Sequence, residues 1–153
     1  MNATTIQPVE EDVLMLEELL LKMAWLEYKR FWRELSIHDL TPSQFHTLVA
    51  IKENGVGCTM SNLADETNQV SATMTGIVDR LVERGLVERR RYSKDRRRVL
   101  VYLTEYGKAK LEAVYRDKCL KLAGCLENLD RDSRHKLTFS LQQYLQILES
   151  TPL

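Results

Sequence analysis

Apolar side chains recur every three or four residues at both ends of the chain, which predicts long helices there. In residues 9–35, leucine, methionine and aromatic residues are mixed with glutamate and lysine, and glycine and proline are absent. Because apolar positions surround most of this helix, we expect it to be buried on more than one side. Residues 105–149 repeat the amphipathic pattern in two further helices, which Thr104 and either Asp130 or Asp132 cap.

Shorter helices are predicted between these two regions. The sequence Thr41-Pro42-Ser43-Gln44 has the residues of a capping box, with proline at the first helical position, so a helix begins there. That helix ends at Asn54-Gly55, where glycine permits the turn. A second helix begins after Thr59 and places Leu63 and Ala64 inward.

A third short helix and a hairpin complete the middle of the chain. We expect the helix over residues 71–84, with Ser71 as its N-cap and Gly85 directly after its C-cap. Strand-like runs follow at residues 86–91 and 99–103, and polar residues connect them. These elements predict a β-hairpin directly after the third helix.

Basic residues are concentrated on this hairpin, although the chain has a formal net charge of zero. Residues 84–98 contain only two acidic residues, Glu88 and Asp95, and have a net charge of +6. The remaining residues therefore have a net charge of −6. Phosphate binding depends on the local potential, so the hairpin is a candidate anion-binding element. The basic residues are Arg84, Arg89, Arg90, Arg91, Lys94, Arg96, Arg97 and Arg98.

Composition narrows the class of protein further. The longest apolar runs are about four residues, far short of the roughly 20 that span a membrane. The first residues lack the basic and apolar regions of a secretory signal, and three cysteines do not form a disulfide framework. We therefore expect a cytoplasmic protein without membrane contact. No nucleophile elbow, phosphate-binding glycine loop or zinc-protease motif is present, which argues against an enzyme.

The order helix, short helix, turn, helix and basic hairpin is that of a winged helix-turn-helix, which binds double-stranded DNA. We expect residues 71–84 to enter the major groove as the recognition helix, and residues 86–103, the wing, to reach the minor groove and flanking phosphates. Arg80 would contact a phosphate. Small residues at the start of the recognition helix would lie close to the bases, namely Ser71, Ala72, Thr73, Thr75 and Gly76.

Motifs spaced along the chain resemble the MarR (multiple antibiotic resistance regulator) family. They include Leu40-Thr41-Pro42-Ser43-Gln44-Phe45, Ile77-Val78-Asp79-Arg80-Leu81, Arg84-Gly85-Leu86-Val87, Asp95-Arg96-Arg97 and Val99-Leu100-Val101-Tyr102-Leu103-Thr104. With the flanking helices, the resemblance extends over roughly residues 9–149. It implies a mainly α fold with a small β-wing, in which residues 1–153 form one domain. The winged helix-turn-helix occupies residues 41–104, between long dimerisation helices at residues 9–35 and 105–149.

The resemblance also implies a homodimeric regulator on a pseudo-palindromic operator, commonly a repressor whose DNA affinity a small aromatic or anionic effector changes. At the wing tip, Asp95 would brace Arg97, which would enter the minor groove, while Arg96 and Arg98 would contact phosphates. Arg90 and Lys94 are further candidate DNA contacts. The exposed apolar faces of the terminal helices independently favour a dimer, since a single chain would leave them in water.

Several residues allow two interpretations. Trp25, Tyr28, Trp32, His38 and His46 are candidates for an effector pocket, but aromatic residues in this helix are equally consistent with a dimer core. The three histidines lack metal-site spacing, so we expect neither a metal nor a cofactor. We interpret the three cysteines as buried structural residues rather than oxidant sensors. A winged helix whose basic hairpin binds an acidic protein is the alternative to DNA binding.

Overall fold

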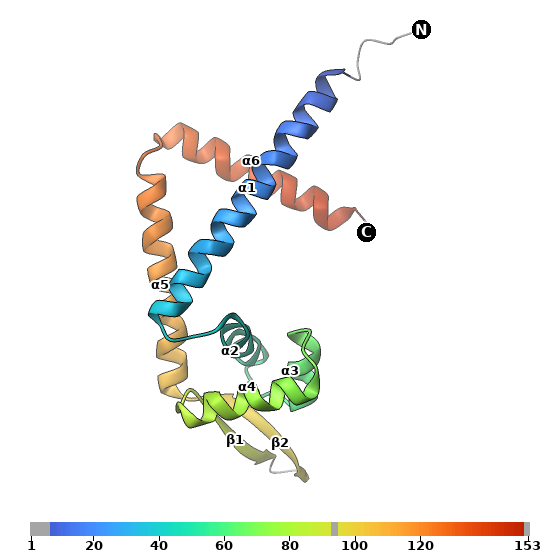
Figure 1. Ribbon diagram of the computed structural model, residues 1–153, viewed down its shortest axis with the longest axis vertical. Helices are drawn as coiled ribbons and strands as arrows, with labels where there is room; N and C mark the ends of the chain where they lie inside the picture. The colour runs from blue at the N-terminus through green and yellow to red at the C-terminus, as the bar shows by residue number, and fades with distance from the viewer. Residues whose placement is uncertain (1–6, 93–94, 152–153) are drawn as a thin grey trace. The chain divides into compact units, whose positions relative to one another are not determined.

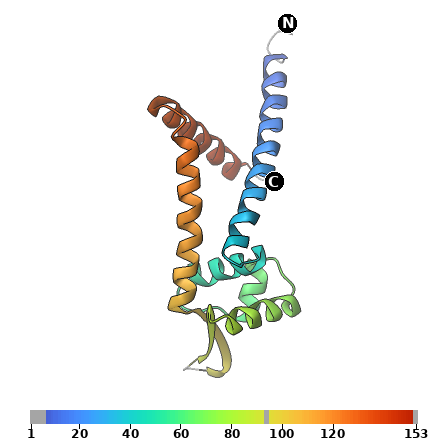
Figure 2. The ribbon, with the colours of Figure 1, turned by 60° about the vertical axis from the view of Figure 1, so that its left-hand side comes forward.

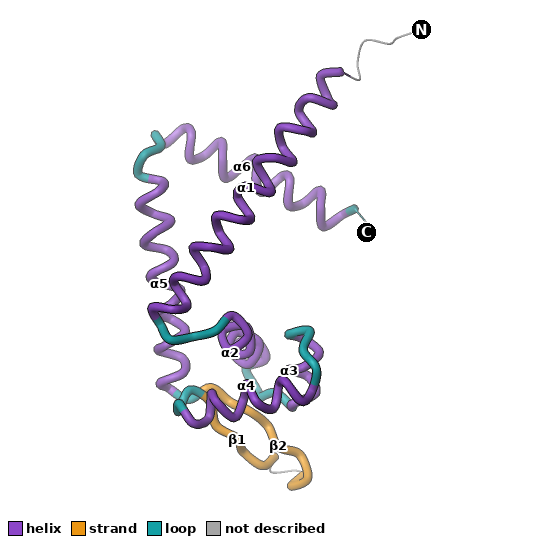
Figure 3. Tube along the Cα trace, in the orientation of Figure 1, coloured by secondary structure: helices purple, strands orange, loops and turns teal. Residues whose placement is uncertain are grey.

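The computed structural model describes residues 7–92 and 95–151, and the side chains of residues 12–91 and 99–151. Within these residues the chain is mostly helical and has one two-stranded antiparallel sheet (Figure 1 and Figure 3). It divides into two compact units, Met1–Val114 and Tyr115–Leu153. The elements are α1 (Gln7–Ile37), α2 (Pro42–Asn54), α3 (Met60–Glu66), α4 (Ser71–Glu83), β1 (Val87–Tyr92), β2 (Asp95–Leu103), α5 (Glu105–Leu126) and α6 (Arg131–Ser150).

Side-chain caps begin most of these helices where the sequence predicted them. The Thr41 side chain accepts a hydrogen bond from the Gln44 backbone, and the Gln44 side chain accepts one from the Thr41 backbone, so the capping box is confirmed. Thr59 caps α3, and Asp130 caps α6 by accepting from the Ser133 backbone N–H at 2.8 Å. The Ser133 hydroxyl donates a further hydrogen bond to the other carboxylate oxygen of Asp130. The backbone and side-chain hydrogen bonds from Ser133 hold the pKa of Asp130 below its usual range.

The start of α4 differs from the prediction. Ser71 is the first helical residue, and the N-cap position belongs to Val70, whose side chain cannot accept a hydrogen bond. The prediction of Ser71 as N-cap is therefore wrong by one residue. The end of α4 agrees with the prediction, since Gly85 has φ +68° and the Leu86 backbone N–H donates to the Leu81 carbonyl at 2.9 Å.

The core of the first unit lies where α2, α3, α4 and the sheet meet. Leu48 of α2, Leu63 of α3 and Met74 of α4 are fully buried, and Val101 contributes from β2. The end of α1 joins this core through Leu35, and the Phe31 ring packs edge-on against Phe45. Packing of α1 against α2 thus fixes the helix-turn-helix to the end of the long first helix.

The hairpin is longer than the sequence predicted. β1 extends to Tyr92 and β2 begins at Asp95, four residues before the expected start at Val99. Val87 pairs with Leu103 and Arg91 with Val99, and the register changes between Arg91 and Tyr92. Figure 1 and Figure 2 show the hairpin extending past α4. On the other edge of β2, Cys58 and Val101 exchange two backbone hydrogen bonds.

The long helices display apolar side chains on their surfaces. On α1, Leu14 and Leu21 are each 67% exposed, and on α6, Phe139 and Ile147 are about as exposed. Cys119 and Cys125 are also exposed, which corrects the prediction that all three cysteines are buried. Among the described helices, none combines the length and apolar character that crossing a membrane requires.

Candidate nucleic-acid interface

Helix α4 has one buried face and one exposed face. Met74, Val78 and Leu81 recur at helical spacing and have no exposed surface, because they pack into the core. The opposite face carries the residues that the sequence assigned to DNA contact, and all of them are exposed: Ser71, Ala72, Thr73, Thr75, Gly76 and Arg80. The sequence-predicted recognition residues thus share an accessible surface of small side chains.

Hydroxyl groups on this surface can take part in further hydrogen bonds. The Thr75 hydroxyl donates to the Ser71 carbonyl at 3.0 Å, which leaves its oxygen able to accept. Ser71 does not cap the helix, so its hydroxyl is not committed to the backbone there. At Gly76, a Cβ atom would meet nothing within 4 Å, so this position is an open gap on the exposed face.

Two arginines of β1 are already paired within the protein. Arg89 forms an ion pair with Asp79 of α4, with Nη1 and Oδ1 2.6 Å apart. Arg90 pairs with Glu88 of the same strand and lies over the Tyr102 ring, 5.2 Å from its centre. The Glu88 hydrogen bond raises the pKa of Arg90 above its usual value. Arg91 is exposed, and it is the last residue of β1 whose side chain the structure describes.

The wing tip is described only in part. Lys94 lies outside the described residues, and for Asp95, Arg96, Arg97 and Arg98 the structure gives the backbone of β2 without the side chains. Their predicted contacts with phosphates and the minor groove stay predictions. The backbone places all four on the strand that continues into Val99–Leu103, whose Val101 is part of the buried core.

Arg84 has a role that the sequence did not reveal. Its guanidinium donates to the carbonyl of Asp39, in the turn between α1 and α2, and at 3.4 Å to Oε1 of Gln44, in the first turn of α2. From the sequence alone, Arg84 belongs to the basic residues of the hairpin, but in the structure its side chain points toward the turn between α1 and α2. Its partners lie 40 and 45 residues earlier in the chain, so only the fold brings them together.

Comparison with known proteins finds a family match over part of the chain. Residues 40–99 match the MarR family. They cover α2, α3, α4 and most of the hairpin, which are the elements that carry the exposed recognition face and the basic residues.

Over residues 40–99 the chain is similar to the MarR family.

Relatives of this chain are named as regulators of transcription. The HTH-type transcriptional regulator YfiV of Bacillus subtilis is 27% identical over 98% of this chain and 91% of its own length. The HTH-type transcriptional repressor NicR of Pseudomonas putida is 42% identical, over 50% of this chain and 48% of its own. A solved MarR family protein from Bacillus stearothermophilus is 28% identical with a TM-score of 0.79, covering 92% of this chain and 98% of its own. The mainly α fold with a small wing is therefore confirmed.

The five residues predicted for an effector pocket lie in three different places. Trp25, Tyr28 and Trp32 form an exposed row along α1, with adjacent ring centres about 6 Å apart. His38 is buried at the end of α1, whereas His46 of α2 contacts the Phe31 ring and lines a surface groove of about 670 Å³. The structure therefore does not enclose these five residues in one cavity.

A second cavity lies on the hairpin face that carries Arg90. It has a volume of about 560 Å³ and lies between the end of α2, the wing and the start of α5. Lys52, Arg90 and Lys108 line it together with Glu88, Tyr102 and other residues. Among the described residues, no group of three His, Cys, Asp or Glu side chains is arranged to hold a metal ion.

Proposed function

We propose that the chain is a sequence-specific regulator of transcription that binds double-stranded DNA. The observation that carries the proposal is the exposed small-residue face of α4 beside an arginine-rich hairpin. A helix with short side chains can approach base edges closely, and its hydroxyl and methyl groups offer contacts in the major groove. The hairpin supplies the positive charge that phosphate binding requires.

The proposed binding mode assigns each element to one part of the duplex. Residues 71–84 enter the major groove, with Ser71, Thr73 and Thr75 near the base edges and Arg80 on a phosphate. The wing, residues 86–103, follows the backbone toward the adjacent minor groove. There Asp95 holds Arg97 in position, in keeping with the family pattern at these residues.

A homodimer is the proposed functional form. Exposed leucine and aromatic side chains on α1 and α6 form apolar surfaces that a second copy of the chain would cover. Twofold symmetry would place two recognition helices about 34 Å apart, one turn of DNA, and would require a pseudo-palindromic operator. Because it acts on DNA, we assign the dimer to the cytoplasm.

Neutralising the wing tests DNA binding. The triple variant R96Q/R97Q/R98Q is expected to weaken operator binding strongly and to lower the slope of log affinity against log salt by about 0.9 for each lost phosphate contact. The control makes the same charge change on α6, at Arg131, Arg134 and Lys136. The operator fragments for both titrations are those that the unchanged protein selects from a pool of random DNA. Full affinity in the triple variant would instead support an acidic protein partner for the hairpin.

Sedimentation of the purified chain tests the dimer. Truncation after Asn128 removes α6, and we expect aggregated or unfolded protein because the remaining apolar surfaces lose their cover. A soluble, DNA-binding monomer after this truncation would contradict the proposed assembly.

We further propose that the chain is a repressor whose DNA affinity a small aromatic or anionic effector lowers. The similarity to the repressor NicR over half the chain supports repression. Both tryptophans lie in the exposed aromatic row of α1, so their fluorescence reports on binding there. Salicylate is the test ligand, and it should quench this fluorescence and release operator DNA over the same concentration range. Quenching without release would contradict effector control.

A further inference from the structure

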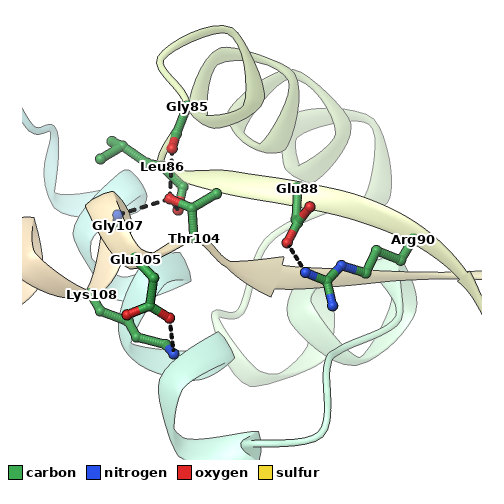
Figure 4. A network of polar contacts seen from close by, with 8 residues as sticks. All are labelled: Gly85, Leu86, Glu88, Arg90, Thr104, Glu105, Gly107 and Lys108. Carbon is green, nitrogen blue, oxygen red and sulfur yellow. Dashed lines mark hydrogen bonds and ion pairs between the residues drawn. The ribbon is translucent and has the colours of Figure 1, made fainter.

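The junction between α4 and β1, residues 84–86, is held from two sides by segments far away in the sequence. On one side, Arg84 donates hydrogen bonds to the Asp39 carbonyl and to Gln44 Oε1. On the other side, the Thr104 hydroxyl donates to the Gly85 carbonyl at 2.6 Å (Figure 4). The recognition helix and the wing therefore meet at residues 84–86, whose position is fixed by contacts with the Asp39–Gln44 segment and with Thr104.

The Asp39–Gln44 side is itself rigid. Gln44 is buried, and the Oε1 atom that faces Arg84 also accepts from the Thr41 backbone in the capping box at 3.0 Å. Asp39 has φ +53°, a left-handed turn conformation that aspartate tolerates better than most non-glycine residues, and this conformation shapes the turn before α2. The Arg84 guanidinium therefore meets two oxygens whose positions the turn between α1 and α2 already determines.

The Thr104 side is equally close-packed. Thr104 Oγ1 accepts from the Gly107 backbone at 2.9 Å, and the Thr104 backbone N–H donates to the Leu86 carbonyl at 3.1 Å. A Cβ atom at Gly107 would lie only 2.0 Å from the Leu86 oxygen. This contact leaves the start of the wing no room to move toward α5.

Arg80 lies in the last turn of α4 and Arg84 is the C-cap residue four positions later, but the two have different surroundings. Arg80 is exposed, as a phosphate contact should be, whereas Arg84 is half-buried and directed at the α1–α2 turn. Charge-assisted hydrogen bonds to fixed acceptors are among the stronger polar contacts in proteins. The geometry therefore leaves Arg80 available for a phosphate and commits Arg84 to the turn between α1 and α2.

We propose that Arg84 is a positioning residue for DNA recognition: by binding the α1–α2 turn, it sets the angle at which α4 and the wing meet the duplex. The proposal rests on the proposed DNA binding, but its contacts are independent of DNA. It also means that movement at the end of α1 would reach the recognition helix through this side chain.

The substitution R84M, compared with R80M, separates positioning from phosphate contact. R84M is expected to lower operator affinity about tenfold, the effect of losing a charge-assisted hydrogen bond, with affinity for random duplex and the salt slope unchanged. R80M should lower the salt slope by about 0.9 and weaken both duplexes alike. A salt slope that falls in R84M as it does in R80M would overturn the proposal.

R84K gives a second test in case R84M unfolds. Lysine keeps the positive charge but lacks the planar group that reaches two oxygens. Operator preference should therefore fall in R84K although the salt slope stays that of the unchanged protein. Operator affinity equal to that of the unchanged protein would count against positioning.

A measurement without DNA distinguishes failure of this inference from failure of the proposed function. Nitroxide labels are attached at Ile37 and Val82, which are both exposed, after Cys119 and Cys125 are replaced by serine. Labelled chains are diluted with unlabelled chains so that only distances within one chain are measured. The distribution should be narrow, should broaden in R84M and should stay narrow in R80M. An unchanged width in R84M refutes the inference, whereas a chain that lacks operator preference refutes only the proposed function.

Discussion

Asp79 and Arg89 join the recognition helix to the first strand of the wing, with Nη1 of Arg89 2.6 Å from Oδ1 of Asp79. Asp79 precedes the exposed Arg80, and Arg89 pairs across the hairpin with the fully buried Val101. The ion pair thus lies between the two elements proposed to enter adjacent grooves. It also neutralises one arginine that would otherwise be available to any phosphate.

Replacing Asp79 should make DNA binding less selective. D79N removes the partner of Arg89, so affinity for random duplex should rise while the ratio of operator to random affinity falls. Both side chains are one-third to one-half exposed, so we expect less than about 1 kcal/mol of lost stability. Titrations at several salt concentrations with both duplexes measure the ratio. D132N on α6 is the control, and an unchanged ratio in D79N would argue against a role in selectivity.

Replacing Gly76 by alanine should raise the stability of the fold and lower its affinity for DNA. A Cβ atom there meets nothing within 4 Å, so G76A is expected to stabilise the fold by about 0.5–1 kcal/mol because alanine favours the helix. The added methyl group stands on the proposed DNA face, so operator affinity should fall. Thermal unfolding and operator titration of the same preparation provide the comparison. G124A in α5 is the control, since it also has open space but belongs to a helix that is not assigned to DNA contact. Unchanged affinity in G76A would remove Gly76 from the interface.

Sequence reasoning located the elements well because their signals are local. The capping box at Thr41, the cap at Asp130 and the turn at Gly85 depend on residues within a few positions of one another. The shift at Ser71 shows the limit of such signals, because both Val70 and Ser71 precede the buried Met74 and the pattern cannot decide which residue is helical first. The sequence predicts the second strand too short because cross-strand pairing, rather than intrinsic preference, extends it over charged residues.

The partners of charged side chains could not be predicted in the same way. All the arginines from residue 84 to residue 91 read as one basic tract, yet Arg84 and Arg89 find partners on other elements. Such pairs depend on how α4 packs against α2 and β1, which the spacing of residues along the chain does not contain. The exposure of Cys119 depends likewise on what covers α5.

Gly107 should be intolerant of substitution. The Leu86 carbonyl would lie 2.0 Å from a Cβ atom at this position, and that carbonyl accepts from the Thr104 backbone. G107A must therefore displace the start of the wing or of α5, at a cost of about 1–3 kcal/mol typical of overpacking. Urea unfolding measures the loss. T104S, which keeps the capping hydroxyl, should stay near the unchanged protein, and a G107A chain of equal stability would contradict the close contact.

Cys58 should be a poor nucleophile in the folded chain. Burial, and secondarily the charge of Glu66, raise the pKa of its thiol from 9.0 to about 11. At pH 8 the thiolate fraction is therefore about a hundredfold lower than in the unfolded chain, and alkylation by iodoacetamide should slow at least in that proportion. Mass spectrometry of peptides containing Cys58, from folded and urea-unfolded protein, gives both rates.

Because the pKa is raised on folding, the thiol's contribution to stability is complete below pH 9 and is lost as the pH rises toward about 11. C58A should weaken that pH dependence, and rapid labelling of folded Cys58 at pH 8 would show that the thiol is not protected.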